Sequence, residues 1–259
     1  MSEPQDAPQF PEGVAVVAGG SGGLGRAACE AMARQGSNVA IIYRSKDANA
    51  AAAVEAVRGH GVEAETYKLD LTDSALCEST LAAIAERFGR IHTAVYAAGP
   101  SITISHLSRI APEEFQRVLI ADVQACFNFV RAVLPHLRVK GGAAIGVTTE
   151  QLDRVSLRGG LSSVPKAAVD KMFQVIAKEE ARFGIRAATL RAGWVDTGLG
   201  NEALSTKMSE EARKALLAGI PLGRMGDAYE IGESIAFLAS RRGGYITGVS
   251  LTVNGGSHL

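Results

Sequence analysis

Short apolar runs alternate with helix-like patterns along almost the whole chain. Seven runs have the length and apolar content of buried strands. They are Val14–Ala18, Val39–Tyr43, Val62–Leu69, Ile91–Ala97, Ala143–Val147, Ile185–Leu190 and Val249–Val253. Helical spacing follows from Arg26 to Gly36, Asp47 to Gly59, Asp73 to Phe88, Pro112 past Val133, Lys166 to Phe183 and Asp227 to Ala239. This alternation predicts a single α/β domain: a doubly wound parallel sheet of about seven strands with helices on both faces.

The first strand leads directly into a glycine cluster, Gly19-Gly20-Ser21-Gly22-Gly23-Leu24-Gly25, and a helical pattern begins at Arg26. Glycines allow a sharp turn and the close approach of a pyrophosphate to the backbone. The helix end supplies unpaired N–H groups and a partial positive charge. Because the cluster lies between a strand and a helix, it predicts a dinucleotide site of the Rossmann-fold type.

Composition narrows the functional classes. The 259 residues suit one large α/β domain, and 27 Lys+Arg balance 27 Asp+Glu, so no basic surplus points to nucleic acid. Three cysteines indicate a reduced, cytoplasmic protein. No uninterrupted apolar run reaches the roughly 18 residues of a membrane span. His106 and His136 lack partners at metal-ligand spacing, so no metal site is expected.

Residues 1–12 are expected to form a flexible arm before a domain of residues 13–259.

The end of the second strand indicates which cofactor is bound. In dinucleotide folds an acid at this point binds the ribose hydroxyls, and a cation in its place accommodates a 2′-phosphate. Here the strand ends in Tyr43-Arg44-Ser45-Lys46 with no acid before Asp47. Arg44 can hold a phosphate with its planar fork, and Ser45 can donate a hydroxyl. The sequence therefore favours NADP(H) over NAD(H).

From Val14 to Gly256 the chain resembles the short-chain dehydrogenases/reductases. Ala18–Gly25 is similar to the family's T-G-x-x-x-G-x-G, Asp70-Leu71 to the pair that contacts adenine, and Ala97-Ala98-Gly99 to the end of N-N-A-G. Ala192-Gly193-Trp194-Val195-Asp196-Thr197 resembles the P-G-x-x-x-T segment around the nicotinamide carboxamide. The glycine loop, the end of strand two and the resemblance together give the cofactor-binding set Gly19, Ser21, Gly22, Gly23, Leu24, Gly25, Arg44, Ser45, Asp70, Leu71, Ala97, Ala98, Gly99, Lys166, Ala192, Gly193, Val195 and Thr197.

The catalytic positions depart from the family's Asn, Ser, Tyr and Lys. Lys166 is the lysine, but Ser162 stands at the tyrosine position four residues before it. Thr149 stands at the serine position and Asp122 at the asparagine position. A serine hydroxyl is too weak an acid to replace a phenol tuned by a neighbouring ammonium. General acid catalysis contributes about 10² to 10⁴-fold, so its loss would leave a poor ketoreductase.

Three functional hypotheses follow. The first is an NADP-dependent reductase with altered proton delivery, acting on a carbonyl or a conjugated C=C of a small apolar substrate. It resembles in part the 2,4-dienoyl-CoA reductases, which also carry serine at this position and a Thr-Thr pair, although Gln151 stands where they place a tyrosine. Glu150, Asp122 or a water must then supply the proton. The second is a catalytically silent NADP(H)-binding protein or partner subunit. The third is an ordinary ketoreductase whose acid lies elsewhere.

Two further expectations concern the substrate and the assembly. Trp194 is expected to wall the substrate pocket, beneath a covering segment around residues 198–220. The sequence specifies neither the substrate nor the direction of reaction. The resemblance implies a homotetramer paired through two long helices, which are rich in small or apolar residues. These residues are Ala121, Ala125, Phe129, Ala167, Val169, Phe173 and Ala177.

Overall fold

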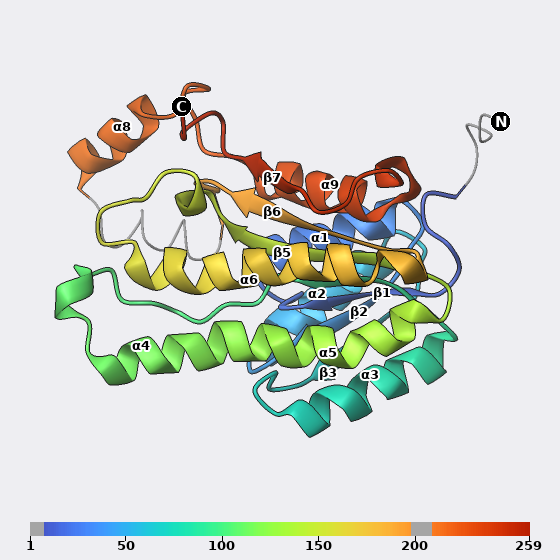
Figure 1. The fold of residues 1–259 in the computed structure, drawn as a ribbon. Coiled ribbons are helices and arrows are strands. Elements are labelled where there is room, and N and C mark those ends of the chain that lie inside the picture. Colours follow the sequence, from blue (N-terminus) through green and yellow to red (C-terminus); the bar gives the residue numbers. More distant parts are fainter. Residues whose placement is uncertain (1–7, 198–208) are drawn as a thin grey trace.

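The computed structural model describes residues 8–197 and 209–259 (Figure 1). Its centre is a seven-stranded parallel sheet in the order β3-β2-β1-β4-β5-β6-β7. The strands are β1 Val14–Ala18, β2 Asn38–Tyr43, β3 Ala64–Lys68, β4 Ile91–Tyr96, β5 Gly142–Thr149, β6 Ile185–Ala192 and β7 Ser250–Val253. The expected doubly wound sheet is confirmed.

Helices cover both faces of the sheet. They are α1 Gly23–Arg34, α2 Asp47–Arg58, α3 Ser74–Phe88, α4 Pro112–Leu119, α5 Ala125–Arg138, α6 Gly160–Glu179, α8 Glu210–Ala218 and α9 Ala228–Ala239. Ala15 and Val17 of β1 join the core under α1, α2 and α9, whereas Val14 and Val16 join the core under α3, α5 and α6. This alternation along one strand is the period of two that buries both faces of a parallel sheet.

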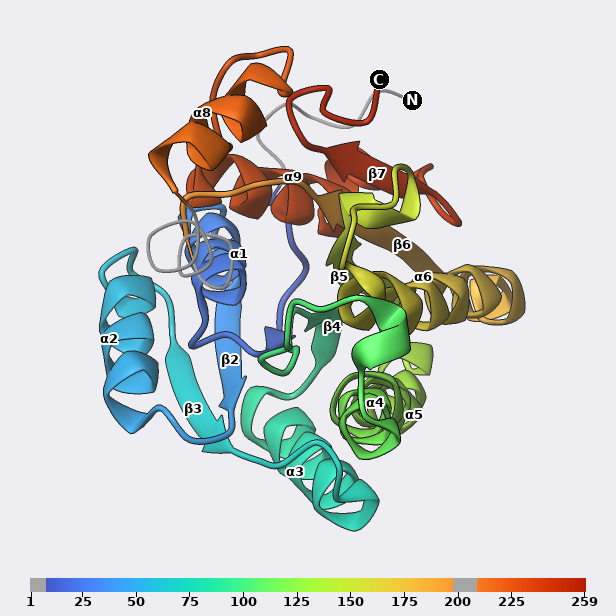
Figure 2. The same ribbon diagram turned by 90° about the vertical axis from the view of Figure 1, so that its left-hand side faces the viewer.

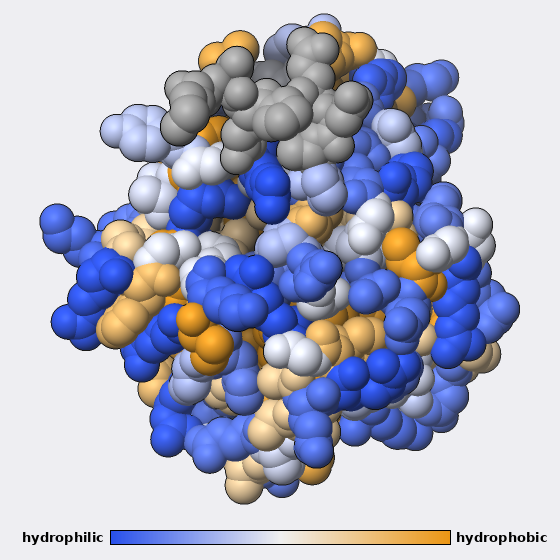
Figure 3. All heavy atoms as spheres, turned by 90° about the vertical axis from the view of Figure 1, so that its right-hand side faces the viewer, coloured by the Kyte–Doolittle hydropathy of each residue, from blue (hydrophilic) through white to orange (hydrophobic). Residues whose placement is uncertain are grey.

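The carboxyl ends of all seven strands lie at one end of the molecule, which faces the viewer in Figure 2. The chain order reverses between β1 and β4, and ligands of such sheets bind outside the strand ends at this point. Figure 3 shows the opposite end, where hydrophilic residues predominate and apolar ones are scattered. A ligand is therefore expected to bind at the end of the molecule that faces the viewer in Figure 2.

A π-helical turn, Ile120–Gln124, joins α4 and α5 into one long helix. Within the described residues this helix, Pro112–Arg138, is long and apolar enough by length and composition to cross a membrane, although polar residues interrupt its apolar runs in the sequence. Half of its most apolar window is buried inside the domain. It packs on β4 beside α3, as a core helix does.

The structure differs from expectation in three places. The helix α6 begins at Gly160, so Ser162 lies in its first turn. Phe10, within the expected arm 1–12, is only 4% exposed and stacks on His92, so this part of the arm belongs to the core. Five of the seven residues expected at a subunit interface are instead buried in the chain's own core: Ala125, Phe129, Val169, Phe173 and Ala177.

Candidate nucleotide and substrate site

The glycine loop between β1 and α1 forms a cradle that has no room for side chains. A Cβ on Gly25 would lie 2.2 Å from the carbonyl oxygen of Gly19, and one on Gly19, at a φ of +82°, would lie 2.8 Å from the Ala97 carbonyl oxygen. Gly22 caps α1 without a side-chain hydrogen bond. The first N–H groups of the helix are thus left for a ligand, which is how such loops hold a pyrophosphate.

A cleft of about 220 Å³ opens beside this cradle. Ten of the expected cofactor residues line it: Gly19, Ser21, Gly22, Arg44, Ser45, Asp70, Leu71, Ala97, Ala98 and Gly99. The residues that resemblance assigned to adenosine are therefore brought together by the fold.

Charge in this cleft is concentrated at its rim. Arg44 and Lys46 both line it, and neither makes a hydrogen bond or ion pair with another described side chain. Asp70 lines the cleft too, and the backbone N–H and the hydroxyl of Thr72 donate to its carboxylate at 3.0 and 2.8 Å. These two bonds, helped by the nearby charge of Arg44, hold the pKa of Asp70 below its usual range. The rim thus offers two uncommitted cations to an anionic ligand.

Lys166 lies behind Ala98 and Gly99, which line the cleft, in a buried charge cluster. Its Nζ is 2.9 Å from Asp122 Oδ1 and donates to the Ala98 carbonyl oxygen at 3.0 Å. The Tyr96 hydroxyl donates to the Asp122 carbonyl oxygen at 2.8 Å and to Oδ1 at 3.3 Å. Burial and the neighbouring Asp122 raise the pKa of Tyr96 well above its ordinary value. The lysine therefore faces a carboxylate directly.

The two hydroxyl residues of the expected catalytic set lie on different elements. Ser162 precedes Lys166 by one turn of α6, which places both residues on the same helix face. Thr149 ends β5, and its Oγ1 accepts the backbone N–H of Gln151 at 3.3 Å. That bond caps the short helical turn Glu150–Leu152 and leaves the threonine proton free to be donated.

The segment from Ala192 to Thr197 leaves β6 and crosses toward the glycine loop. A Cβ on Gly23 would lie 2.3 Å from Thr197 Oγ1, so the two segments are in close contact. Val195 bridges to Gly226, and its carbonyl oxygen accepts the Thr197 N–H at 2.8 Å. The segment thus reaches the N-terminus of α1, where the expected phosphate contacts lie.

A second cavity of about 340 Å³ lies beyond the end of β5. Its walls are Glu150, Arg154, Val155, Ser156, Leu157, Trp194, Ala215, Leu216, Gly219, Ile220 and Ser257. Ser257 donates to the Glu150 carboxylate, which lies beside the backbone of Gly193. Trp194 therefore walls a pocket, as expected, and α8 covers it; the rest of the expected covering segment, 198–208, lies outside the described residues.

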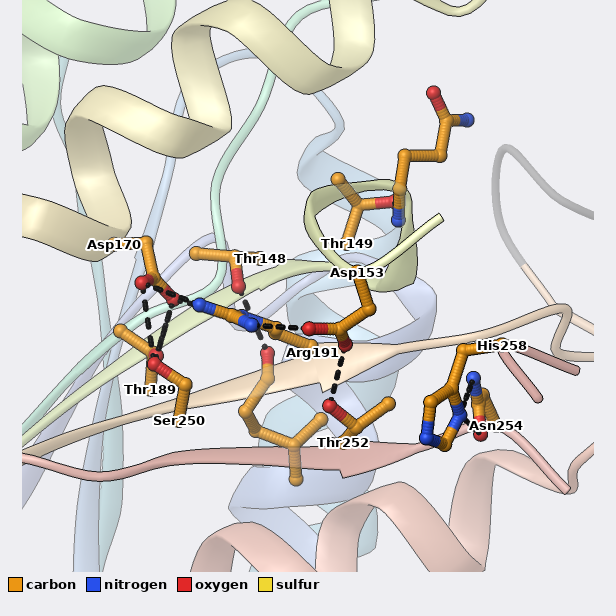
Figure 4. Close-up of polar contacts among 12 residues, drawn as sticks. Thr148, Thr149, Asp153, Asp170, Thr189, Arg191, Ser250, Thr252, Asn254 and His258 are labelled. Carbon is orange, nitrogen blue, oxygen red and sulfur yellow. Dashed lines mark hydrogen bonds and ion pairs between the residues drawn. The ribbon is translucent and has the colours of Figure 1, made fainter. Parts of the chain in front are cut away.

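An ion-pair network supports the loop that carries Glu150 (Figure 4). Arg191 of β6 pairs with Asp170 of α6 at 2.9 Å and with Asp153, which follows the Glu150–Leu152 turn. Burial alone would raise the pKa of Asp170, but hydrogen bonds from Arg191 and Thr189 outweigh it and hold the pKa below its usual range. One guanidinium thus ties the loop to both the sheet and α6.

Hydroxyl groups complete this network. Thr189 donates to Asp170 at 2.6 Å, and Ser250 of β7 donates to it at 3.1 Å. Thr252 of β7 donates to Asp153 at 2.7 Å. The acids therefore have donors besides Arg191, as a half-buried charge cluster requires.

Sequence reasoning missed Tyr96, Lys46 and Arg191. Lys46 carried a visible signal, since it follows Arg44 by two positions at the end of β2. Tyr96 and Arg191 gave no signal of the contacts that they make, because their partners lie 26 and 21 positions away in the chain.

Comparisons with known proteins agree with this geometry. The family model described as enoyl-(acyl carrier protein) reductase matches residues 18–258. The 3-oxoacyl-[acyl-carrier-protein] reductase FabG of Escherichia coli (strain K12) is 31% identical over 249 residues, which span 95% of this chain and 97% of that protein. FabG of Staphylococcus aureus (strain N315) is 28% identical over 255 residues, with 95% and 98% covered.

Solved structures show the same fold. A short-chain dehydrogenase/reductase from Serratia marcescens BCRC 10948 superposes with a TM-score of 0.87 at 27% identity, covering 98% of this chain and all of that chain. A short-chain type dehydrogenase/reductase from Mycobacterium ulcerans gives 0.90 at 23% identity, covering 96% and 91%. By sequence and by fold, the chain belongs to the short-chain dehydrogenase/reductase family of oxidoreductases.

Proposed function

We propose that this protein is an NADP(H)-dependent reductase with an altered catalytic set, which transfers a hydride to a carbonyl or conjugated C=C of a small apolar substrate. The observation that carries the proposal is the presence of two spaces, a nucleotide cleft lined by two uncommitted cations and a partly apolar cavity lined by Glu150, the residue after Thr149. Arg44 and Lys46 suit the 2′-phosphate of NADP(H), since no acid stands in their place. The glycine cradle fits the pyrophosphate.

The proton source in this proposal is Glu150, directly or through a water. Asp122 is committed to its ion pair with Lys166 and is not among the residues that line the second cavity, whereas Glu150 lines it. None of the five tyrosines, all within the described residues, lines it. This argues against an ordinary ketoreductase with a displaced acid. Thr149 would orient the substrate oxygen, and Lys166 would orient the nicotinamide ribose. Ser162 is smaller than the tyrosine that the family has at this position, so it would leave the space of that phenol open.

The names of the relatives and of the matching family model suggest which substrates to test. Relatives are named for 3-oxoacyl and enoyl groups on acyl carrier protein, so 3-oxoacyl and conjugated enoyl thioesters are the first candidates. The test follows the loss of NADPH absorbance with each thioester and with simple ketones. Glu150→Gln should lower turnover at least about a hundredfold while leaving NADPH affinity unchanged. Equal turnover by this variant would remove Glu150 from the mechanism.

Cofactor preference is tested separately by calorimetric titration. NADPH should bind more tightly than NADH, and Arg44→Ala should weaken NADPH binding about tenfold or more, since a hydrogen-bonded charge pair contributes roughly 1.5–3 kcal/mol. Equal affinities for the two cofactors in the wild type would contradict the assignment.

A second candidate is a catalytically silent NADP(H)-binding protein. The specific observation in its favour is that the ammonium of Lys166 is paired with Asp122, while the one phenol beside it in the described residues, Tyr96, is fully buried and hydrogen-bonded to the same carboxylate. Tight NADPH binding without turnover of any thioester or ketone would support this candidate over the reductase.

We also propose a homotetramer assembled through α5 and α6. Between these helices lies a groove of about 640 Å³, and Phe127 and Val175 on its walls are 48% and 44% exposed. Exposed apolar side chains along a groove suit an interface with another copy of the chain, and charged residues such as Arg131 and Glu179 line the same groove. Sedimentation should give four times the 27.0 kDa chain mass, and a monomer at micromolar concentration would contradict the proposal.

A further inference from the structure

Lys166 and Asp122 form a buried pair of opposite charges behind the wall of the nucleotide cleft. Their side chains are 16% and 5% exposed, and the two charged atoms are 2.9 Å apart. The other side chains around the pair are neutral. Burial raises the pKa of the Tyr96 phenol and of the Cys126 thiol, so neither adds a charge. The electrostatic field here is thus set by one cation and one anion.

This pair lies directly beneath the wall of the cleft. Lys166 Nζ donates to the carbonyl of Ala98, and a Cβ on Gly99 would lie 3.6 Å from the same nitrogen. Ala98, Gly99 and Ala121, the residue before Asp122, all line the cleft. Any charge that develops in a ligand beyond Gly99 therefore interacts with both members of the pair.

We propose that Asp122 sets the balance between the two oxidation states of the bound cofactor, by favouring the oxidised nicotinamide over the reduced one. This inference rests on the proposed function. NADPH gives up a hydride, that is one proton and two electrons, and its ring thereby gains one positive charge. A lone ammonium behind Ala98 and Gly99 would oppose that charge in a ligand bound beyond them. The carboxylate of Asp122 cancels the ammonium, so the hydride donor becomes stronger than in a site with a neutral side chain at position 122.

The effect is measurable because it changes a ratio of affinities. A unit charge within about 10 Å, at an effective dielectric constant of about 20, changes the binding of another unit charge roughly tenfold. Water in the cleft reduces this, and we expect a change of about threefold or more. Contacts to the ribose and phosphates are shared by NADP⁺ and NADPH, so they cancel in the ratio.

The experiment measures the Kd of NADP⁺ and of NADPH by calorimetry on the full chain. In Asp122→Asn the ratio Kd(NADP⁺)/Kd(NADPH) should rise about threefold or more relative to wild type. Two controls should keep the ratio within about twofold. Tyr96→Phe removes the hydrogen bond to Asp122 but keeps its charge. Asp170→Asn neutralises another buried acid, on the same helix as Lys166 but outside the cleft.

The possible results separate this inference from the proposed function. If the wild type binds neither form, the proposed function fails and the inference with it. If both forms bind and the ratio is unchanged in Asp122→Asn, the inference is overturned while NADP(H) binding stands. Asp122→Ser is a second neutral variant, and it decides the question if Asp122→Asn does not fold.

Discussion

Under the proposed function the cleft has an adenosine half and a nicotinamide half, and these two regions are built by different means. The first is made by backbone: Gly19 and Gly25 leave room where side chains would collide, and helix α1 offers its N–H groups. The second is made by charged side chains, above all Lys166 with Asp122. Behind it, outside the cleft, the network of Arg191 with Asp170 supports the loop that carries Glu150. A backbone cradle keeps its ligand when neighbouring side chains change, whereas a site made of side-chain atoms changes its chemistry with each substitution. This contrast explains why one half matches the family motif and the other departs from it.

The largest expected effect tests the backbone half. Gly25→Ala should weaken NADPH binding at least about a hundredfold, because the new Cβ would lie 2.2 Å from the Gly19 carbonyl oxygen and must displace the cradle. Calorimetry measures the loss. Gly59→Ala is the matched control, since Gly59 has an ordinary helical φ of −57° far from the cleft. Binding by Gly25→Ala within tenfold of wild type would show that the cradle is not the phosphate site.

Substitutions in the ion-pair network of Arg191 should instead lower the stability of the folded protein. Arg191→Met leaves Asp170, whose side chain is 6% exposed, without its cation and should lower the free energy of unfolding by about 3 kcal/mol. Urea denaturation measures it. Arg26→Met, which breaks the more exposed pair with Glu30, should cost under about 1 kcal/mol. Similar losses in both variants would contradict a special role for the Arg191 network.

The dependence of stability on pH should test the same ion pair between Arg191 and Asp170. Since the pKa of Asp170 is lowered in the folded protein, its contribution to stability is full above its ordinary value of about 3.9 and is lost as the pH falls through the folded value. Wild-type unfolding free energy should therefore drop below about pH 4. In Arg191→Met this part of the drop should shrink, because the hydrogen bonds that lower the pKa are gone. Parallel pH profiles for the two proteins would contradict this assignment.

A gain of function tests whether the nicotinamide half still has the family's geometry. Ser162→Tyr combined with Asp122→Asn should raise reduction of simple ketones at least about tenfold, because it restores a phenol one helical turn before Lys166 and frees the ammonium to tune it. Ser162→Phe with Asp122→Asn is the control for bulk. No gain with cofactor binding intact means that the pocket has diverged beyond the missing acid.

The smallest effect concerns the second cation of the adenosine half. Lys46→Ala should weaken NADPH binding about threefold and leave NADH binding unchanged, since an exposed charge pair contributes up to about 1 kcal/mol. The NADPH effect should shrink at high salt. An equal loss for both cofactors would place Lys46 away from the 2′-phosphate.

The sequence predicted the elements of the sheet and the adenosine half because both depend on local patterns. Strand, glycine loop and helix are contiguous, and Arg44 follows directly from the end of β2. The nicotinamide half depends on pairs distant in the chain, such as Lys166 with Asp122 and Arg191 with Asp153. A sequence pattern names such residues singly but does not say which of them meet. For that reason the sequence indicated Asp122 only as one of several candidate proton donors. Its pairing with Lys166 is visible only in the structure.

The π-helical turn Ile120–Gln124 separates two jobs of one long helix. Such a turn holds one residue more than a regular α-helical turn. Losing that residue would return the stretch to regular α-helix and leave Phe129 and Val133, now fully buried, on the core face. It would, however, change the direction of the side chain at position 122. The meeting of Asp122 with Lys166 therefore depends on the local helix geometry as well as on the residue type.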